Sequence, residues 1–156
     1  MKKYSIRPYQ ESDYELWNTF VSAAKNATFL FHRDFMEYHK ERFEDFSLLV
    51  FDKVKLVAVL PANRVDNKVY SHQGLTYGGL VYASKLKIEK IEVILDLLFD
   101  FFKSKRIEHF YLHPIPSFYL GQGNAAIDFF LMKQRSQLYR KEMNMVAHLH
   151  QEIPIS

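Results

Sequence analysis

The sequence contains no cysteine among its 156 residues. This absence excludes disulfide bonds, a catalytic thiol, zinc sites with cysteine ligands and iron–sulfur clusters. Glycine and proline are also scarce, at five residues each, so the chain does not have the composition of a low-complexity or disordered protein. Hydrophobic residues make up 48% of the chain and aromatic residues 16%, which is enough for the core of one ordinary domain.

The chain also lacks a long uninterrupted hydrophobic run. Its most apolar stretch, Ile88 to Phe102, contains five charged residues and therefore cannot cross a membrane. The charged N-terminal residues do not form a signal peptide, so we expect a cytoplasmic protein. The formal net charge of +3 is mild, and it suits an anionic small molecule or an RNA without identifying either.

Hydrophobic periodicity predicts both strands and helices. Apolar residues spaced by three and four predict helices, and short alternating or continuous apolar runs predict strands. In chain order we expect a strand at 3–7, a helix up to residue 24 that opens with a Ser12–Glu15 capping box, a helix at 33–39, strands at 47–51, 56–60, 69–71 and 78–82, a helix at 87–103, a strand at 107–113, a helix at 125–133 and a strand at 137–150. This order predicts one α/β (α+β) domain with a mixed sheet covered by helices.

The most informative segment runs from Ser71 to Gly79. It holds three glycines in six residues, with a histidine, a glutamine, a threonine and a tyrosine between and before them. Glycine allows the backbone to approach a ligand closely, and the polar side chains offer a base, an amide, a hydroxyl and a phenol. We therefore expect a working surface here, with a β-bulge carrying a structural histidine as the alternative.

Other motifs give weaker signals. Gly121-Gln122-Gly123 could cradle a phosphate, although a surface loop is the favoured interpretation. The histidine pairs 109/113 and 148/150 each share a strand face, but no third ligand accompanies them, so we expect no metal. The chain has no nucleophile elbow, no Walker loop and no paired catalytic carboxylates, which points away from hydrolases and NTPases.

Three stretches together resemble a known family: residues 25–39, Leu60-Pro61-Ala62-Asn63, and residues 71–79. They are similar to the N-terminal half of bacterial GNAT-type acyltransferases of the Fem-like group, proteins built from two GNAT-like domains. The resemblance implies a GNAT-like mixed, mainly antiparallel sheet flanked by helices. It also implies transfer of an acyl group from a thioester or an aminoacyl-tRNA to an amine, with acetyl-CoA as the expected donor.

The resemblance suggests roles for particular residues. His72 is the candidate base and Tyr77 the candidate acid. The expected acceptor contacts are Asn63, Gln73, Gly74, Thr76, Gly78, Gly79, His32 and Arg33. In GNAT enzymes a glycine-containing loop between the fourth strand and the third helix holds the coenzyme A pyrophosphate. The corresponding junction here, residues 82–87, has no glycine, and it offers only Ser84, Lys85 and Lys87.

Three functional hypotheses follow. The first is acetyl-CoA-dependent N-acetylation of an amino sugar or related amine in surface-polysaccharide synthesis, with a small-molecule amine or a nucleotide sugar as the acceptor. The second is a Fem-like aminoacyl transfer from tRNA to a cell-wall precursor. The third is a non-catalytic GNAT-like binding or assembly module. We expect residues 1–150 to form the domain and 151–156 to begin a missing second domain, with a second GNAT-like domain or a homodimer as the structural partner.

Overall fold

The computed structural model describes residues 4–38, 40–116, 119 and 125–140 and places eight strands among them in two four-stranded sheets. The first sheet has the order β1-β3-β4-β7, built from Tyr4–Pro8, Leu48–Asp52, Lys55–Leu60 and Val81–Tyr82, and all its pairs are antiparallel. The second has the order β2-β5-β6-β8, built from Glu44–Asp45, Asn63–Val65, Lys68–Tyr70 and His109–Tyr111. Its β6–β8 pair is parallel, so the expected mixed, mainly antiparallel arrangement is confirmed.

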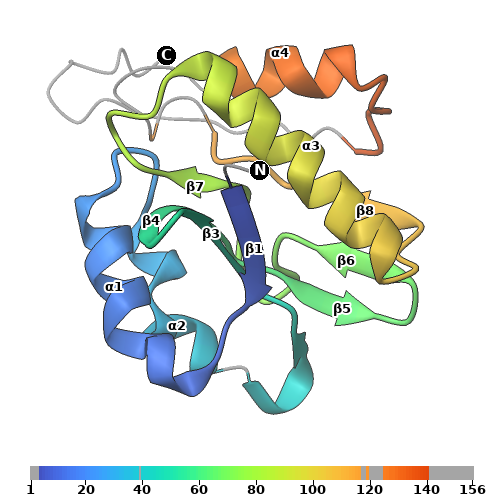
Figure 1. The fold of residues 1–156 in the computed structure, drawn as a ribbon. Helices are drawn as coiled ribbons and strands as arrows, with labels where there is room; N and C mark the ends of the chain where they lie inside the picture. Colours follow the sequence, from blue (N-terminus) through green and yellow to red (C-terminus); the bar gives the residue numbers. More distant parts are fainter. Residues whose placement is uncertain (1–3, 39, 117–118, 120–124, 141–156) are drawn as a thin grey trace, which may run out of the picture.

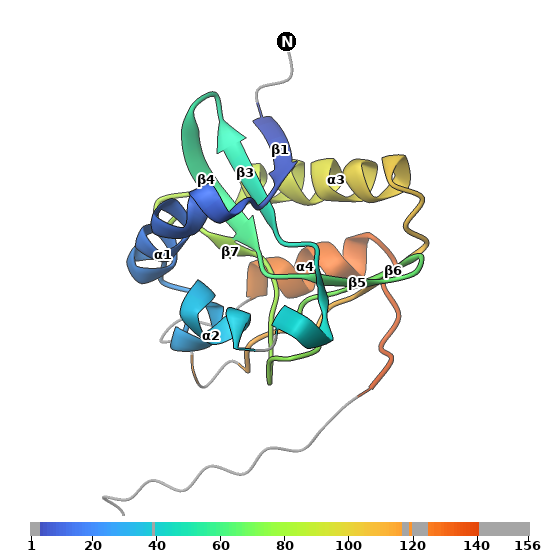
Figure 2. The same cartoon turned by 90° about the horizontal axis from the view of Figure 1, so that it is seen from below.

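Four α-helices cover the sheets (Figures 1 and 2). They are α1 (Tyr14–Ala23), α2 (Arg33–Glu37), α3 (Ile88–Ser104) and α4 (Ala125–Lys133), and three short 3-10 turns accompany them at Glu11–Asp13, Phe29–Phe31 and Lys40–Arg42. Helices α1 and α2 lie on one side of the β1-β3-β4-β7 sheet and α3 lies on the other (Figure 2). Within the described residues, no helix is both long and apolar enough to span a membrane.

Alternation along β3 and most of β4 divides the interior into two cores, with a register shift after Val50 and with Val57 and Ala58 both on the α3 side. Leu48, Val50 and Leu60 point toward α3, whereas Leu49 and Val59 point toward α1 and α2. Successive side chains of a strand face opposite sides of the sheet, so a run of apolar residues supplies both cores at once. This explains why the two strands are continuous apolar sequences rather than alternating ones.

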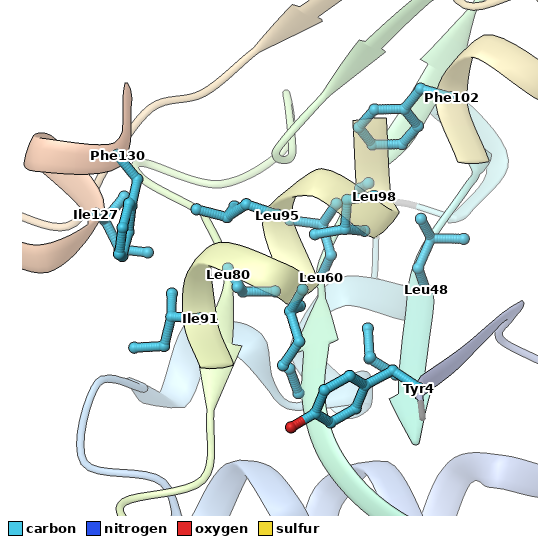
Figure 3. Packing of buried hydrophobic residues seen from close by; sticks show 14 of the residues in the cluster. Tyr4, Leu48, Leu60, Leu80, Ile91, Leu95, Leu98, Phe102, Ile127 and Phe130 are labelled. Carbon is cyan, nitrogen blue, oxygen red and sulfur yellow. The ribbon is translucent and has the colours of Figure 1, made fainter. Parts of the chain in front are cut away.

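Helix α3 forms one wall of the first core (Figure 3). Ile91, Leu95, Leu98 and Phe102 are spaced by three and four residues and are all at least 95% buried. The predicted stripe also included Ile88, which is 58% exposed because it is the first residue of the helix and lies beyond the sheet. The α4 helix occupies the predicted residues, and its Ile127 and Phe130 extend the same core.

Several local predictions were wrong. Ser12 does not cap α1: residues 11–13 form a 3-10 turn, and the Asp13 carboxylate accepts from the Gln10 backbone N–H at 3.0 Å. The strand predicted at 107–113 is only β8, and the predicted second helix ends at Glu37. Residues 137–140 carry no strand, and the remainder of the strand expected there lies outside the described residues. The short strands β2 and β5 were not predicted, because two or three residues carry too little periodicity.

Candidate functional site

Residues 72–77 form an excursion, a loop whose two ends lie side by side next to the chain of β8. The Ser71 N–H donates to the Tyr111 carbonyl at 3.0 Å, and the Gly78 N–H donates to the His113 carbonyl at 2.6 Å. Both ends of the excursion are therefore held by the same stretch of chain at and just after β8. A Cβ atom on Gly78 would lie 1.4 Å from the Ser71 carbonyl oxygen, so only glycine fits at this closure. The predicted working segment is thus a loop inserted between β6 and β7, larger than a bulge.

The imidazole of His72 is held in one orientation at the base of this excursion. His72 as a whole residue is 7% exposed, its Nδ1 accepts from the Gly74 N–H at 3.1 Å, and the Phe43 ring meets the imidazole edge-on with 5.5 Å between the ring centres. A backbone N–H can only donate, so Nδ1 carries no proton in this arrangement. In the neutral ring the proton is therefore on Nε2. A hydrogen bond between Nε2 and a ligand would have Nε2 as the donor.

His72 lines a cleft of about 350 Å³. The other lining residues lie just after β1, in α2, and between α2 and β3. They are Tyr9, Gln10, Glu11, Arg33, Met36, Glu37, Lys40, Phe43 and Asp45. Three carboxylates and two cationic groups therefore share one concave surface with aromatic rings. This mixture suits a small polar ligand with an ammonium group, because carboxylates attract the charge and ring faces cover its carbon atoms.

Arg33 forms the floor of the cleft and is almost fully buried. Its guanidinium lies 3.7 Å above the centre of the Tyr9 ring, donates to Asp45 at 2.5 Å and to the Ser47 hydroxyl at 3.2 Å, and contacts Glu37 at 3.4 Å. A buried cation is tolerated only when it is paired and hydrogen-bonded in this way. Arg33 therefore fixes the positions of two cleft carboxylates, Glu37 and Asp45.

Tyr9 lines the cleft, but its hydroxyl oxygen is buried. That oxygen makes no hydrogen bond of ordinary geometry to the described residues, although the Arg33 guanidinium lies 3.7 Å from the ring centre. Burial raises the pKa of Tyr9, and Arg33 offsets only part of this rise through its charge and its interaction with the hydroxyl, so the phenol stays neutral at neutral pH. Because the oxygen is closed to solvent, Tyr9 offers other atoms than its hydroxyl to a ligand in the cleft.

The other predicted acceptor contacts are spread over several environments. Asn63 is fully buried, and its side-chain amide bonds Gln73 twice, accepting from the backbone N–H at 2.8 Å and donating to the side-chain oxygen at 2.7 Å. Gln73 and Thr76 are exposed, and His32 is half-buried at the start of α2. Tyr77 packs against Phe31 in the second core and lines neither cavity described here, so the structure does not bring it together with His72.

Of the predicted site residues, the structure brings His72 and Arg33 into one cleft. Sequence reasoning missed Tyr9, Glu11, Glu37 and Asp45. These residues come from three separate segments, and no local motif connects them. The buried Arg33 contacts Tyr9, Glu37 and Asp45, and its burial is not visible in the sequence.

The cavity beside Gly78 and Gly79, two of the predicted acceptor contacts, is small. Its volume is about 10 Å³, and Asn26, Leu112, Ile115 and Ile127 are among the residues that line it. A cavity of this size holds one water molecule. The predicted donor residues Ser84, Lys85 and Lys87 are exposed on the glycine-free turn before α3.

The described residues contain no group of three or more potential metal ligands. His109 and His113 lie on and just after β8. The Gly121–Gly123 loop and the 148/150 histidine pair lie outside the described residues.

Comparison with known proteins identifies the fold. No protein-family model matches the sequence, and no curated protein matches it significantly. Among solved structures, the ribosomal-protein-S18-alanine N-acetyltransferase of Escherichia coli has a TM-score of 0.61 at 14% identity, covering 84% of this chain and 76% of that one.

Two further acetyltransferases are similar along most of their length. An aminoglycoside acetyltransferase from an uncultured soil metagenomic sample, in complex with sisomicin, has a TM-score of 0.52 at 12% identity, covering 97% of each chain. The PaiA N-acetyltransferase of Thermoplasma acidophilum, in complex with coenzyme A, has a TM-score of 0.50 at 15% identity, covering 83% of this chain and 87% of that one. The described strands and helices therefore have the fold of the GNAT N-acetyltransferases.

Proposed function

We propose that this chain is an N-acyltransferase domain that binds an amine acceptor in the cleft beside His72. The observation that carries the proposal is the cleft itself, which combines three carboxylates, a buried Arg33 and the Tyr9 ring on a GNAT fold. Solved structures with this fold include an alanine N-acetyltransferase and an aminoglycoside acetyltransferase bound to sisomicin. Both names describe transfer to an amine.

The acceptor class we propose is an amino sugar, free or linked to a nucleotide. At neutral pH its amine is an ammonium, which Glu11, Glu37 and Asp45 would attract, while the Tyr9 ring would cover carbon atoms of the sugar. Before acyl transfer the ammonium would give one proton to water. The amine nitrogen would then bond to the acyl carbonyl carbon, the carbon–sulfur bond of the thioester would break, and the departing thiolate would take up the second proton from the nitrogen. Positioning of the amine is the contribution that this cleft would make.

In this proposal His72 is a hydrogen-bond donor, because Nδ1 is already engaged by Gly74. Such a donor could bond a hydroxyl oxygen of the acceptor or the carbonyl oxygen of the acyl group. The base role first assigned to His72 would require Nε2 to be unprotonated, which needs the Gly74 bond to break. Tyr77 has no role in the proposal, since it lies in the apolar core.

A second candidate is a non-catalytic binding module with the GNAT fold. The glycine-free junction at residues 82–87 favours it. Such a module would bind an amine in the same cleft but would transfer nothing. The Fem-like arrangement and a second domain are two further proposals, and the activity assay below bears on both.

The test is to incubate the purified full-length protein with acetyl-CoA and a panel of amino sugars, nucleotide-linked amino sugars and aminoglycosides, and to detect products by mass spectrometry. We expect at least one acetylated amine, and we expect His72→Ala to reduce its formation. Binding of an amine without any product, at acetyl-CoA concentrations up to the millimolar range, would favour the module. If the protein neither bound an amine nor formed a product, both the transferase and the binding module would be excluded.

A further inference from the structure

A row of residues in register across the second sheet begins at the cleft. Asp45 lines the cleft and is opposite Asn63 of β5, Asn63 is opposite Tyr70 of β6, and Tyr70 is opposite Tyr111 of β8. Residues directly opposite each other in a sheet point to the same face. Because neighbouring strands are about 4.8 Å apart, Tyr111 lies about 14 Å from Asp45 along the sheet. The row therefore leads from a cleft carboxylate to two tyrosines.

The tyrosines point away from the first core. Val69 of β6 is fully buried in that core, and Phe110 of β8 packs against it. Successive side chains of a strand alternate between the two faces of the sheet, so Tyr70 and Tyr111 lie on the opposite face from α3. Both tyrosines are partly exposed there, on the same face as Asp45.

Three tyrosine rings form one aromatic surface on this face. The rings of Tyr70 and Tyr111 are stacked, with their centres 4.8 Å apart and their planes 9° from parallel. The ring of Tyr139 meets that of Tyr111 at 73°, with 5.5 Å between the centres, and Tyr139 is 83% exposed. A ring exposed to this extent has a face on which a planar ligand can stack. We call Tyr70, Tyr111 and Tyr139 the tyrosine surface.

Two nitrogen-bearing side chains border the tyrosine surface. Lys68 and His109 are directly opposite each other, and each precedes a tyrosine of the stacked pair by two residues on its strand. This spacing puts them on the same face as Tyr70 and Tyr111. An ammonium and an imidazole can both donate to a phosphate oxygen. Aromatic rings beside basic side chains are the combination that binds a nucleotide, because the base stacks and the phosphate is neutralised.

We propose that the tyrosine surface, with Lys68 and His109, binds the nucleotide part of a nucleotide-linked amino sugar. The proposal rests on the proposed function, in which the amine of the sugar lies in the cleft beside Asp45. The diphosphate and the ribose would cross the row of residues, and the base would stack on Tyr139. The acceptor is thereby narrowed from amino sugars in general to those carried on a nucleoside diphosphate.

The test is a calorimetric titration of uridine, thymidine and guanosine diphosphates into the full chain, without any sugar or acyl donor. We expect at least one to bind, and we expect Tyr139→Ala to weaken it about tenfold, as the loss of one stacking contact implies. Tyr139→Phe keeps the ring and should retain the affinity. Tyr38→Ala is the matched control, because Tyr38 is 84% exposed at the end of α2, outside the second sheet. No binding at millimolar concentration, or equal affinities for Tyr139→Ala and Tyr38→Ala, overturns the proposal.

A second pair of variants distinguishes the tyrosine surface from the basic turn before α3. We expect Lys68→Gln to weaken binding of the diphosphate about fivefold, since the lysine is partly exposed and solvent screens its charge. Lys85→Gln removes an exposed lysine of the turn and should match the wild type. Loss of binding in Lys85→Gln but not in Lys68→Gln would place the nucleotide at the turn and refute the proposal.

A neutral disaccharide of N-acetylated amino sugars is the rival ligand, because sugar rings also pack on aromatic faces. If the disaccharide binds in a Tyr139-dependent manner and none of the diphosphates binds, the surface is a sugar site and the proposal is wrong.

The outcome is separable from that of the proposed function, because the titration contains neither an amine nor an acyl donor. Tyr139-dependent binding of a nucleoside diphosphate without any acetylated amine supports the tyrosine surface and not the transferase. Acetylation of a free amino sugar without binding of any nucleoside diphosphate supports the transferase and overturns the assignment of the surface.

Discussion

A Cβ atom placed on Gly78 would lie 1.4 Å from the carbonyl oxygen of Ser71, although the two residues are seven positions apart in the sequence. This near-contact closes the 72–77 excursion and keeps His72 at the edge of the cleft. The position of the excursion therefore depends on Gly78.

Replacing Gly78 should therefore disrupt the fold around the excursion. We expect Gly78→Ala to lower the free energy of unfolding by about 3 kcal/mol, because backbone atoms rather than a movable side chain occupy the Cβ position. Gly74→Ala is the matched control: its Cβ would approach a ring carbon of Phe43 at 2.8 Å, which the ring can relieve by moving. Urea unfolding curves measure both. Equal losses for the two variants would contradict this account of the closure.

The Tyr9 hydroxyl gives a prediction about both stability and binding. Tyr9→Phe removes a buried oxygen that makes no hydrogen bond of ordinary geometry, so we expect the free energy of unfolding to stay the same or to rise slightly. We expect the affinity for the amine acceptor to stay unchanged, because that oxygen is closed to the cleft. Tyr14→Phe is the contrasting variant: it removes a hydroxyl that bonds Asp34 on the surface, away from the cleft, and it should lose some stability. A Tyr9→Phe protein that is less stable, or that binds the acceptor more weakly, would contradict this account of the hydroxyl.

The protonation of His72 can be observed directly. Long-range proton–nitrogen NMR spectra at neutral pH should show a protonated Nε2 and an unprotonated Nδ1, because the Gly74 N–H donates to Nδ1. A proton on Nδ1 would contradict the assigned donor role. We also expect His72→Gln, which retains a donor, to bind the acceptor better than His72→Ala.

Acid should weaken the protein through Asp13. Its carboxylate accepts from Arg7 at 2.5 and 2.7 Å, and this pairing holds the pKa of Asp13 below its ordinary value of 3.8. Because the folded pKa is depressed, the stabilisation is complete above about pH 4 and is lost as the pH falls toward the folded value. We expect a loss of about 1 kcal/mol, since the Arg7 side chain is 40% exposed and solvent screens the pair.

Unfolding curves between about pH 7 and pH 3 test this prediction. Asp13→Asn should be less stable than the wild type at pH 7 and should show a flatter pH dependence. Asp66→Asn, which changes a charge in an exposed turn, should keep the wild-type slope. A wild-type slope in Asp13→Asn would assign the acid sensitivity to other groups.

The helices and strands that depend on local periodicity could be predicted from the sequence. The features that depend on contacts between distant residues could not. The helices α3 and α4 follow from apolar residues at three- and four-residue spacing, and the twin cores follow from the apolar runs of β3 and β4. The predicted Ser12–Glu15 cap is absent because the Asp13 carboxylate pairs with Arg7 in β1. Residues 11–13 form a 3-10 turn before α1 instead. A capping motif alone does not reveal such a competitor.

The site was only partly predictable for the same reason. His72 and Arg33 were identified as candidates, but their roles depend on neighbours that the sequence does not connect to them. Gly74 fixes the His72 proton, and Asp45 and Tyr9 hold Arg33 in place. The pairing of Asn26 with Leu80 and Tyr82 spans more than fifty positions, and no local pattern reports it.

The central claim is that an amine acceptor binds in this cleft and is acylated there. The most direct measurement is kcat/KM for the acetylated amine in Glu11→Gln, which removes a carboxylate of the cleft, beside Glu15→Gln, which removes one from α1 outside it. We predict a fall of about tenfold for Glu11→Gln and no change for Glu15→Gln. Equal values for the two variants would contradict the claim.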